Sequence, residues 1–246
     1  MSIKSTFPWL VILGLAAIVI KDHYFGEAGH EAHATPQEAY LHEEVTGVKQ
    51  SPINIKTSKI CKPKPHQFQC SYKNSHEKIV NTGHTIRLDY DSGSVLEYDG
   101  QAYNLRQFHF HTPSEHLIDG ITYPMEAHFV HTAADNDTTY LVVGVLFKEG
   151  NENDFLKKFI NSVPDHEGEK ELWTDYINAD DIVKASDHFY CYDGSLTTPP
   201  FTETVKWFVK QDILDASEEQ IMMINELEGN NARHIQAVNN REIEGL

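Results

Sequence analysis

The chain has little positive charge and little cysteine. Its 246 residues contain 20 Lys and Arg against 37 Asp and Glu, which gives a formal net charge of −17. An acidic surface repels phosphate backbones, so this balance argues against nucleic-acid binding and favours solubility. The three cysteines, Cys61, Cys70 and Cys191, match no zinc or redox spacing. Which of them pair, if any, cannot be chosen from the sequence.

Long hydrophobic runs are absent beyond the N-terminus. Residues 7–20 form an apolar run that follows Lys4 and is shorter than the roughly 20 residues of a membrane span. This layout is typical of a signal peptide. We therefore assign residues 1–34 to a signal peptide or an uncleaved membrane anchor plus a polar arm, and residues 35–246 to a single domain. The expected location is periplasmic or extracellular, with membrane anchoring as the alternative.

The sequence after the polar arm has no internal repeat and is mostly strand-like. Residues 85–90 and 204–210 alternate with period two, and Asp99-Gly100 is a hairpin signal between residues 94–98 and a segment that starts at Gln101. Residues 140–147 form a nearly continuous apolar run, as in a strand buried on both faces. Helical spacing predicts one helix over residues 153–163 and another after the capping box at residues 217–220. These patterns predict an α+β fold in which a few peripheral helices flank one large sheet.

Two histidines are placed on the same face of one predicted strand. Residues 107–111 read Gln-Phe-His-Phe-His, and side chains two apart on a strand share a face. His109 and His111 therefore point the same way as Gln107, while the two phenylalanines point to the opposite face. A turn signal at residues 119–120 lets the return segment run antiparallel and bring His128 opposite the pair.

Three imidazoles with an open fourth position describe a catalytic zinc site. A lone His-x-His pair can arise by chance in a chain with 15 histidines. Here Gln107 and Glu126 each stand two residues before a candidate ligand and share its face, where they can accept the second ring N–H. We therefore predict that His109, His111 and His128 bind Zn²⁺, with Gln107 and Glu126 orienting the rings.

Five motifs occur in one order, at residues 50–55, 81–84, 107–116, 126–128 and 195–200. They read Gln-Ser-Pro-Ile-Asn-Ile, Asn-Thr-Gly-His, Gln-Phe-His-Phe-His-Thr-Pro-Ser-Glu-His, Glu-Ala-His and Ser-Leu-Thr-Thr-Pro-Pro. From about Gln50 to Ile243 the chain resembles the α-class carbonic anhydrases, close to the bacterial secreted type. The resemblance implies a twisted, mostly antiparallel central sheet of about ten strands. It also implies reversible hydration of carbon dioxide to bicarbonate through zinc-bound hydroxide, sulfonamide or anion inhibitors at the zinc, and a homodimer as one possible assembly.

The resemblance also implies roles for three polar residues. His84 would be the proton shuttle, because an imidazole with an ordinary pKa of about 6.5 takes and gives protons near neutral pH. Thr197 would accept a hydrogen bond from the hydroxide and donate its own proton to Glu115. The alternatives are an exposed loop histidine without a role at position 84 and a surface ion pair between Glu115 and His116 or a lysine.

A small apolar wall would hold the gas beside the hydroxide. The family mapping offers five apolar side chains for it, each explained equally well as ordinary core, and places Thr198 in the same pocket. We interpret His116 and His131 as structural, because their spacing fits neither the ligand face nor a fourth ligand. The five apolar residues are Val130, Val142, Leu196, Val205 and Trp207.

The chain departs from the family pattern at three places. Family members often pair a cysteine before the Gln-Ser-Pro motif with one just after Thr-Thr-Pro-Pro, but Phe201 follows Pro200 here, so that disulfide is absent. Residues 23–26 contain no Trp where the family usually has Trp-Gly-Tyr. The four histidines of residues 23–42 belong either to a solvated arm or to a loose metal-binding tail. Arg87 places a cation near the expected proton path.

Two other functions compete with carbon dioxide hydration. One is a non-catalytic zinc-binding protein on the same fold, which typically lacks a ligand histidine, although all three are present here. The other is a zinc-hydroxide esterase. The sequence contains no Gly-x-Ser-x-Gly element, so a dedicated serine esterase is not supported.

Overall fold

The computed structural model of the protein describes residues 47–62 and 65–246. The predicted targeting segment and the histidine-containing arm lie outside these residues. Among the described residues, no helix is both long enough and apolar enough to cross a membrane.

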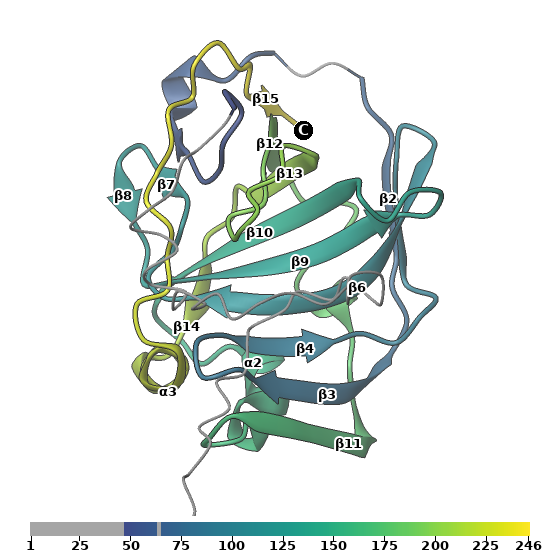
Figure 1. The fold of residues 1–246 in the computed structure, drawn as a ribbon, viewed down its shortest axis with the longest axis vertical. Helices are drawn as coiled ribbons and strands as arrows, with labels where there is room; N and C mark the ends of the chain where they lie inside the picture. Colours follow the sequence, from purple (N-terminus) through teal and green to yellow (C-terminus); the bar gives the residue numbers. More distant parts are fainter. Residues whose placement is uncertain (1–46, 63–64) are drawn as a thin grey trace, which may run out of the picture.

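One large sheet organises the molecule (Figure 1). It contains twelve strands, and every pair is antiparallel except β10 with β13 and β10 with β14. The predicted α+β fold on a mostly antiparallel sheet is thus confirmed, with more strands than the roughly ten implied by resemblance. Along the sheet the strands are β11 (Gly168–Ile177), β3 (Ser75–Asn81), β4 (Ile86–Asp89), β6 (Gln101–His111), β9 (Met125–Ala133), β10 (Tyr140–Glu149), β13 (Val205–Lys210), β12 (Phe189–Gly194) and β15 (Glu244–Gly245).

The remaining strands are short and lie beside this path. β2 (Phe68–Ser71) pairs with β5 (Val95–Tyr98), β5 pairs with β6, and β14 (Leu214–Ala216) pairs with β10. A separate three-stranded sheet is formed by β1 (Asn54–Ile55), β7 (Leu117–Ile118) and β8 (Ile121–Thr122).

Both predicted turns join antiparallel strands. Asp99 and Gly100 connect β5 to β6 with φ of 48° and 82°, and Asp119 and Gly120 connect β7 to β8 with φ of 52° and 87°. Positive φ at both central residues is the requirement of a type I′ hairpin turn, which explains the Asp-Gly sequence at each. The second hairpin leads the chain back from β6 into β9.

Two α-helices are described, and both begin at caps visible in the sequence. Asn153 caps α2 (Asp154–Phe159) by accepting from the N–H groups of Phe155 and Leu156. Ser217 and Gln220 form the predicted capping box of α3 (Glu218–Glu228). The first helix is shorter than the predicted residues 153–163, because a 3₁₀ turn, η2 (Ile160–Ser162), follows it and Val163 precedes a proline. Two other 3₁₀ turns are η1 (Thr57–Lys59) and η3 (Ala179–Asp181).

The sheet separates two apolar clusters. The larger contains Phe108, Phe110 and Phe129, which pack against Phe155 and Phe159 of α2. The smaller cluster lies on the opposite face and includes Val130, Val142, Val205 and Trp207. Because β6 and β9 are buried on both faces, their polar residues must find partners inside the protein.

The three cysteines are free thiols in the structure. Burial raises the pKa of Cys70 to about 12 and also raises the pKa of Cys191. A raised pKa keeps a thiol protonated at neutral pH, so neither side chain resembles an activated nucleophile.

His131 is held inside the fold by three polar groups. Its Nδ1 lies 3.0 Å from the Phe129 carbonyl and 3.1 Å from the Leu141 carbonyl, and its Nε2 lies 3.0 Å from the Tyr72 hydroxyl. These partners assign the proton to Nδ1 and make Nε2 the acceptor. Burial lowers the pKa of His131 to about 4. The ring is therefore a neutral structural group, in agreement with its interpretation from sequence.

The burial of His131 predicts a loss of stability in acid. Its folded pKa lies below the ordinary value of 6.5, so the unfolded chain binds a proton that the folded chain refuses as the pH falls from about 6.5 to about 4. Between pH 7 and pH 5 the metal-free protein should lose on the order of 1–2 kcal/mol of unfolding free energy through this group. Urea titrations at both pH values measure the loss. An equal loss in a folded His131→Asn variant would contradict the assignment.

Candidate functional site

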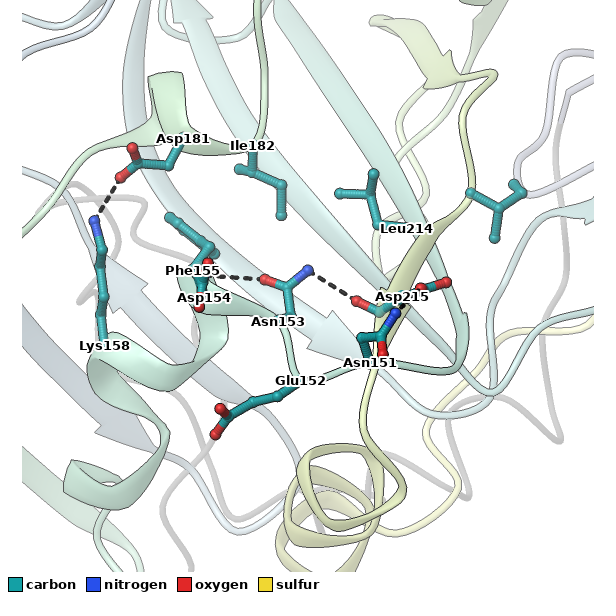
Figure 2. Close-up of a pocket in the computed structure, with 11 residues that line it drawn as sticks. Asn151, Glu152, Asn153, Asp154, Phe155, Lys158, Asp181, Ile182, Leu214 and Asp215 are labelled. Atoms are coloured by element: carbon teal, nitrogen blue, oxygen red, sulfur yellow. Dashed lines mark hydrogen bonds and ion pairs between the residues drawn. The ribbon is translucent and has the colours of Figure 1, made fainter.

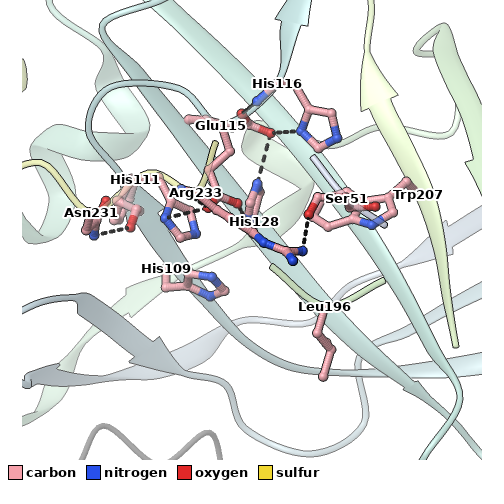
Figure 3. A network of polar contacts seen from close by, with 12 residues as sticks. Ser51, His109, His111, Glu115, His116, His128, Leu196, Trp207, Asn231 and Arg233 are labelled. Carbon is pink, nitrogen blue, oxygen red and sulfur yellow. Dashed lines mark hydrogen bonds and ion pairs between the residues drawn. The ribbon is translucent and has the colours of Figure 1, made fainter. Parts of the chain in front are cut away.

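The three predicted ligands meet on one face of the sheet (Figure 3). His109 of β6 lies directly across from His128 of β9, and His111 follows two residues later on the same strand. The ring centroids of His111 and His128 are 4.6 Å apart, and those of His109 and His128 are 5.3 Å apart. One ring nitrogen from each residue lies within 4.8 Å of the other two.

Burial keeps these imidazoles uncharged. His109, His111 and His128 expose only 8%, 2% and 1% of their surface. Burial lowers the pKa of all three, to about 3 for His111, and the neighbouring imidazoles oppose a further charge on His109 and His111. Neutral imidazole is the form that binds a metal ion, so the set is ready to act as ligands at neutral pH.

Two polar side chains fix the direction of the rings. Gln107 Oε1 lies 2.9 Å from His109 Nδ1, and Glu126 Oε1 lies 2.9 Å from His128 Nε2. These contacts leave His109 Nε2 and His128 Nδ1 as the nitrogens available to a shared ligand. Gln107 and Glu126 thus occupy the places that the sequence spacing predicted.

His111 provides the test of whether the set fits a metal ion. Neither of its ring nitrogens makes a hydrogen bond of normal geometry with a described residue. A buried polar atom without a partner is costly, and a metal ion would satisfy the nitrogen that faces the other two rings. Three imidazole nitrogens and an open fourth position are the donor set that zinc prefers in catalytic sites.

Glu126 connects His128 to a longer buried chain of hydrogen bonds. Its Oε1 also lies 2.7 Å from His116 Nδ1, and His116 Nε2 lies 2.6 Å from the Tyr192 hydroxyl, which donates to Ser51 Oγ at 3.0 Å. Burial raises the pKa of Glu126, but His116 and His128 outweigh burial and hold that pKa well below its usual range. His116 is structural, as predicted from the sequence, and its structural task is to hold the carboxylate that orients His128.

Gly144 makes room for this carboxylate. It lies opposite His128 on β10, and a Cβ at this position would be 2.9 Å from Glu126 Oε1. A larger residue would therefore displace Glu126 from between His116 and His128. This is one position in a strand of mostly large residues where close approach of a side chain requires glycine.

Glu115 is buried beside the imidazoles. It is 1% exposed, and its Oε1 accepts the backbone N–H of Arg233 at 2.9 Å. Burial raises the pKa of Glu115, while the Arg233 N–H and the Thr197 hydroxyl act in the opposite direction. Its nearest cation-forming neighbours are His111 and His128, at 3.7 and 3.9 Å. The alternative of a surface ion pair is wrong for Glu115, because the carboxylate lies inside and His116 pairs with Glu126.

His84 is exposed in the turn before β4. Its carbonyl accepts from Asn231 Nδ2 at 2.9 Å. Arg87 lies directly across from His109 in the sheet, and its guanidinium pairs with Asp89, with Nε 2.8 Å from Oδ1 and Nη2 3.3 Å from Oδ2. The cation near the expected proton path is thus held against an acidic partner on its own strand.

The candidate apolar wall lies on the imidazole side of the sheet. Val130, Val142, Val205 and Trp207 are buried in one cluster, and Leu196 packs against it. The Trp207 ring is 4.8 Å from that of His128, and its Nε1 donates to the Ser195 carbonyl at 3.0 Å. Thr197 is buried and Thr198 half-buried in the loop that begins at this carbonyl. The wall residues thus belong to the small cluster and not to the main core.

Arg233 is a structural residue of the site that sequence reasoning did not identify. Its Nη1 donates to Gln50 Oε1 at 3.0 Å and to the Ser51 carbonyl at 2.6 Å, and its guanidinium lies 3.8 Å from the centre of the Phe201 ring. Phe201 directly follows Pro200 of the Ser-Leu-Thr-Thr-Pro-Pro motif. The resemblance over residues 231–241 was the only signal that could have pointed to this region, and it assigned no role there.

A hollow whose lining contains none of the three imidazoles lies beside α2 (Figure 2). Its polar groups bind one another, with Lys158 Nζ 2.7 Å from Asp181 Oδ2 and Asn153 Nδ2 donating to the Asp215 carbonyl at 2.9 Å. The imidazole cluster therefore remains the candidate functional site.

Comparison with known proteins identifies close relatives of this arrangement. Residues 36–245 match the model of the eukaryotic-type carbonic anhydrase family. The chain is 36% identical to a carbonic anhydrase of Pectobacterium atrosepticum over 199 residues, which cover 80% of each chain. Among solved structures, it is 38% identical to a hyperthermostable carbonic anhydrase from a hydrothermal vent chimney, with a TM-score of 0.77 over 86% of this chain and 96% of that one. The α-carbonic anhydrase of Thermovibrio ammonificans in complex with sulfanilamide is 35% identical, with a TM-score of 0.75 over 80% and 86% of the two chains.

The contact between Glu126 and His128 predicts an effect on metal affinity. Glu126→Ala should weaken zinc binding by about 10–100-fold, the usual range for a residue that orients a metal ligand. Competition with a chromophoric chelator measures the dissociation constant. Glu97→Ala, which removes an exposed carboxylate from β5, is the matched control. Equal affinities of the two variants would show that Glu126 does not support His128.

Proposed function

Because the chain belongs to the eukaryotic-type carbonic anhydrase family, and so is a zinc enzyme for the reversible hydration of carbon dioxide, we propose roles for its residues in that reaction. His109, His111 and His128 hold the zinc ion. The observation that carries this assignment is that three buried imidazoles, whose pKa values are all lowered by burial, each offer a nitrogen within 4.8 Å of the other two. Bound there, zinc acts as a Lewis acid that lets a water molecule lose its proton near neutral pH, the chemistry for which carbonic anhydrases are the standard example.

Gln107 and Glu126 act on the ligands. Each accepts the outer N–H of one ring, which fixes the tautomer and keeps the inner nitrogen free of a proton. The His116, Tyr192 and Ser51 groups behind Glu126 hold that carboxylate in turn. The chain therefore supplies a rigid and uncharged ligand set before any substrate arrives.

Thr197 and Glu115 orient the attacking oxygen. Glu115 accepts the proton of the Thr197 hydroxyl, so the Thr197 oxygen has its lone pairs available to the reacting oxygen atom. This directs a lone pair of that atom at the carbon of carbon dioxide. Arg233 holds Glu115 in place through its backbone N–H, which lowers the pKa of the carboxyl but does not outweigh burial, which raises it.

The apolar cluster and His84 serve the substrate and the proton. An apolar surface beside the ligands lets carbon dioxide bind without displacing tightly held water molecules. It is formed by Val130, Val142, Leu196, Val205 and Trp207, with Thr198 at its edge. His84 is exposed to solvent at the start of β4, where its ring receives the released proton and passes it to buffer. The substrate and product of the protein are thus carbon dioxide and bicarbonate.

The proposal extends to inhibitors, location and assembly. Sulfonamides and small anions bind at the same zinc site, supported by the sulfanilamide complex of the Thermovibrio relative. Residues 1–34 export the protein to the periplasm or the outside of the cell, or anchor it in a membrane, supported by Lys4 and the apolar run that follows. A homodimer is one candidate assembly, and sedimentation analysis of the exported protein distinguishes it from a monomer.

The Thr197 assignment predicts slow turnover with the metal retained. Thr197→Ala should lower the rate of carbon dioxide hydration by on the order of 10²-fold, because removal of one oriented active-site hydrogen bond commonly costs about 2.7–4 kcal/mol. Stopped-flow assays measure the hydration rate, and zinc analysis of the same samples measures the metal content. Chelator-treated wild-type protein gives the rate without metal. Thr202→Ala, which changes an exposed threonine five residues further along the same loop, is the control. Wild-type turnover in Thr197→Ala protein that contains zinc would remove Thr197 and Glu115 from the mechanism.

The His84 assignment predicts a division between two kinetic constants. His84→Ala should lower kcat but leave kcat/KM unchanged. Proton export limits turnover only at saturating carbon dioxide, and the capture of carbon dioxide does not involve His84. Imidazole added as a buffer should restore kcat, since it replaces the lost proton acceptor. Both constants are measured in weak and in strong buffer. An equal fall in both, without rescue, would mean that His84 supports the pocket instead.

A further inference from the structure

The hydrogen bonds between β4 and β6 end just before the segment that carries His84. The last pairs of the ladder are Leu88 with Phe108 and Arg87 with His109. At the next residue, the N–H of Ile86 donates to the side chain of Glu228. Beyond it, the carbonyls of His84 and Phe110 both accept from Asn231 Nδ2, at 2.9 and 3.3 Å. Two side chains from the C-terminal part of the chain, Glu228 and Asn231, thus bind the backbone groups of the two strands at the point where the strands separate.

Glu228 is an unusual residue for this place. It is 5% exposed at the end of α3, whereas Glu226 on the same helix is exposed. A carboxylate at a helix C-terminus opposes the helix dipole, and burial of its charge is costly. Burial raises the pKa of Glu228, and the Ile86 N–H and Asn231 amide act in the opposite direction. Neither helix stability nor solubility explains why a carboxylate is buried here. We therefore look to the groups that it binds.

Asn231 links the same point to the metal-ligand strand. Its side chain donates to Glu228 Oε2 at 3.2 Å and accepts the N–H of Thr112 at 3.1 Å, and its own N–H donates to the Thr112 carbonyl at 3.1 Å. Thr112 follows His111 directly in the chain. Asn231 therefore spans from the end of β6 to the backbone of His84, and Glu228 holds both Asn231 and the start of β4.

We propose that Glu228 is a positioning residue for proton transfer, which holds the backbone of His84 at a fixed distance from the strand of His109 and His111. It does so directly through the Ile86 N–H and indirectly through Asn231. The proposal rests on the proposed role of His84 as proton shuttle. A fixed backbone and an exposed ring suit that role, because the ring can turn between the site and solvent while its attachment point stays in place.

The test compares Glu228→Leu and Glu228→Gln with Glu226→Gln, the exposed control on the same helix. In the metal-free protein, amide hydrogen exchange at Ile86 should be about tenfold faster or more in Glu228→Leu, since the bond to the carboxylate is lost. In the zinc-loaded enzyme, kcat should fall toward the value of His84→Ala, by up to about 10²-fold, with kcat/KM and zinc content unchanged. Glu228→Gln keeps one acceptor oxygen for two donors and should lie between. Imidazole should restore kcat in both variants.

A double variant separates the positioning role of Glu228 from the proton-shuttle role of His84. Glu228→Leu added to His84→Ala should cause no further loss of kcat, because the residue to be positioned is already gone. Normal kcat in His84→Ala alone would overturn the shuttle role and with it this proposal. A lowered kcat in His84→Ala together with a wild-type kcat in Glu228→Leu would overturn only the positioning role of Glu228. A parallel fall of kcat, kcat/KM and zinc content in both Glu228 variants would show that Glu228 serves the general fold.

Discussion

The site depends on keeping three imidazoles uncharged while they lie against one another in the protein interior. A proton on any of them would be both buried and close to two further rings, and burial, with a smaller effect of His128, lowers the pKa of His111 to about 3. The cost of this arrangement is that each ring needs a partner for its outer nitrogen. Gln107 and Glu126 provide two of these partners, and the nearest acidic group to His111 is Glu115, with its Oε1 3.7 Å from His111 Nδ1. The geometry around the rings follows from meeting these needs.

Glu126 shows how far this requirement reaches. Its carboxylate is fully buried, and it remains charged because His116 and His128 both bind it. His116 then needs a partner of its own, which is the Tyr192 hydroxyl, and Tyr192 in turn donates to Ser51. A neutral imidazole at the metal is thus connected through four side chains to the N-terminal part of the domain. A loss anywhere along this chain leaves a buried polar group without a partner, which is why such networks are either complete or destabilising.

Local pattern was enough to predict the ligand face but not the groups that support it. The period of two in residues 107–111 placed Gln107, His109 and His111 on one face, and the same rule paired Glu126 with His128. The capping box at Ser217 and the turns at Asp99 and Asp119 were equally local signals. His116, Tyr192 and Ser51 could not be joined in this way, because 76 residues separate the first pair and 141 the second. The end of α2 was missed because the 3₁₀ turn after it has the same apolar spacing as a helix.

The residues after α3 contribute contacts to the site that are distant in sequence. Arg233 joins Glu115, Gln50 and Ser51 across sequence separations of 118, 183 and 182 residues, and Asn231 reaches His84 across 147. These contacts enter last in a chain synthesised from its N-terminus, and contacts so distant in sequence carry a large loop-closure cost. The Arg233 guanidinium over the Phe201 ring ties the loop of Thr197 to the start of the domain, where Arg233 also binds Gln50 and Ser51. Because the tie is a packed cation over a ring and not a covalent bond, its strength depends on exclusion of water and not on the redox state of the surroundings. The C-terminal segment therefore joins the ligand strands, the Thr197 loop and the His84 turn into one rigid site.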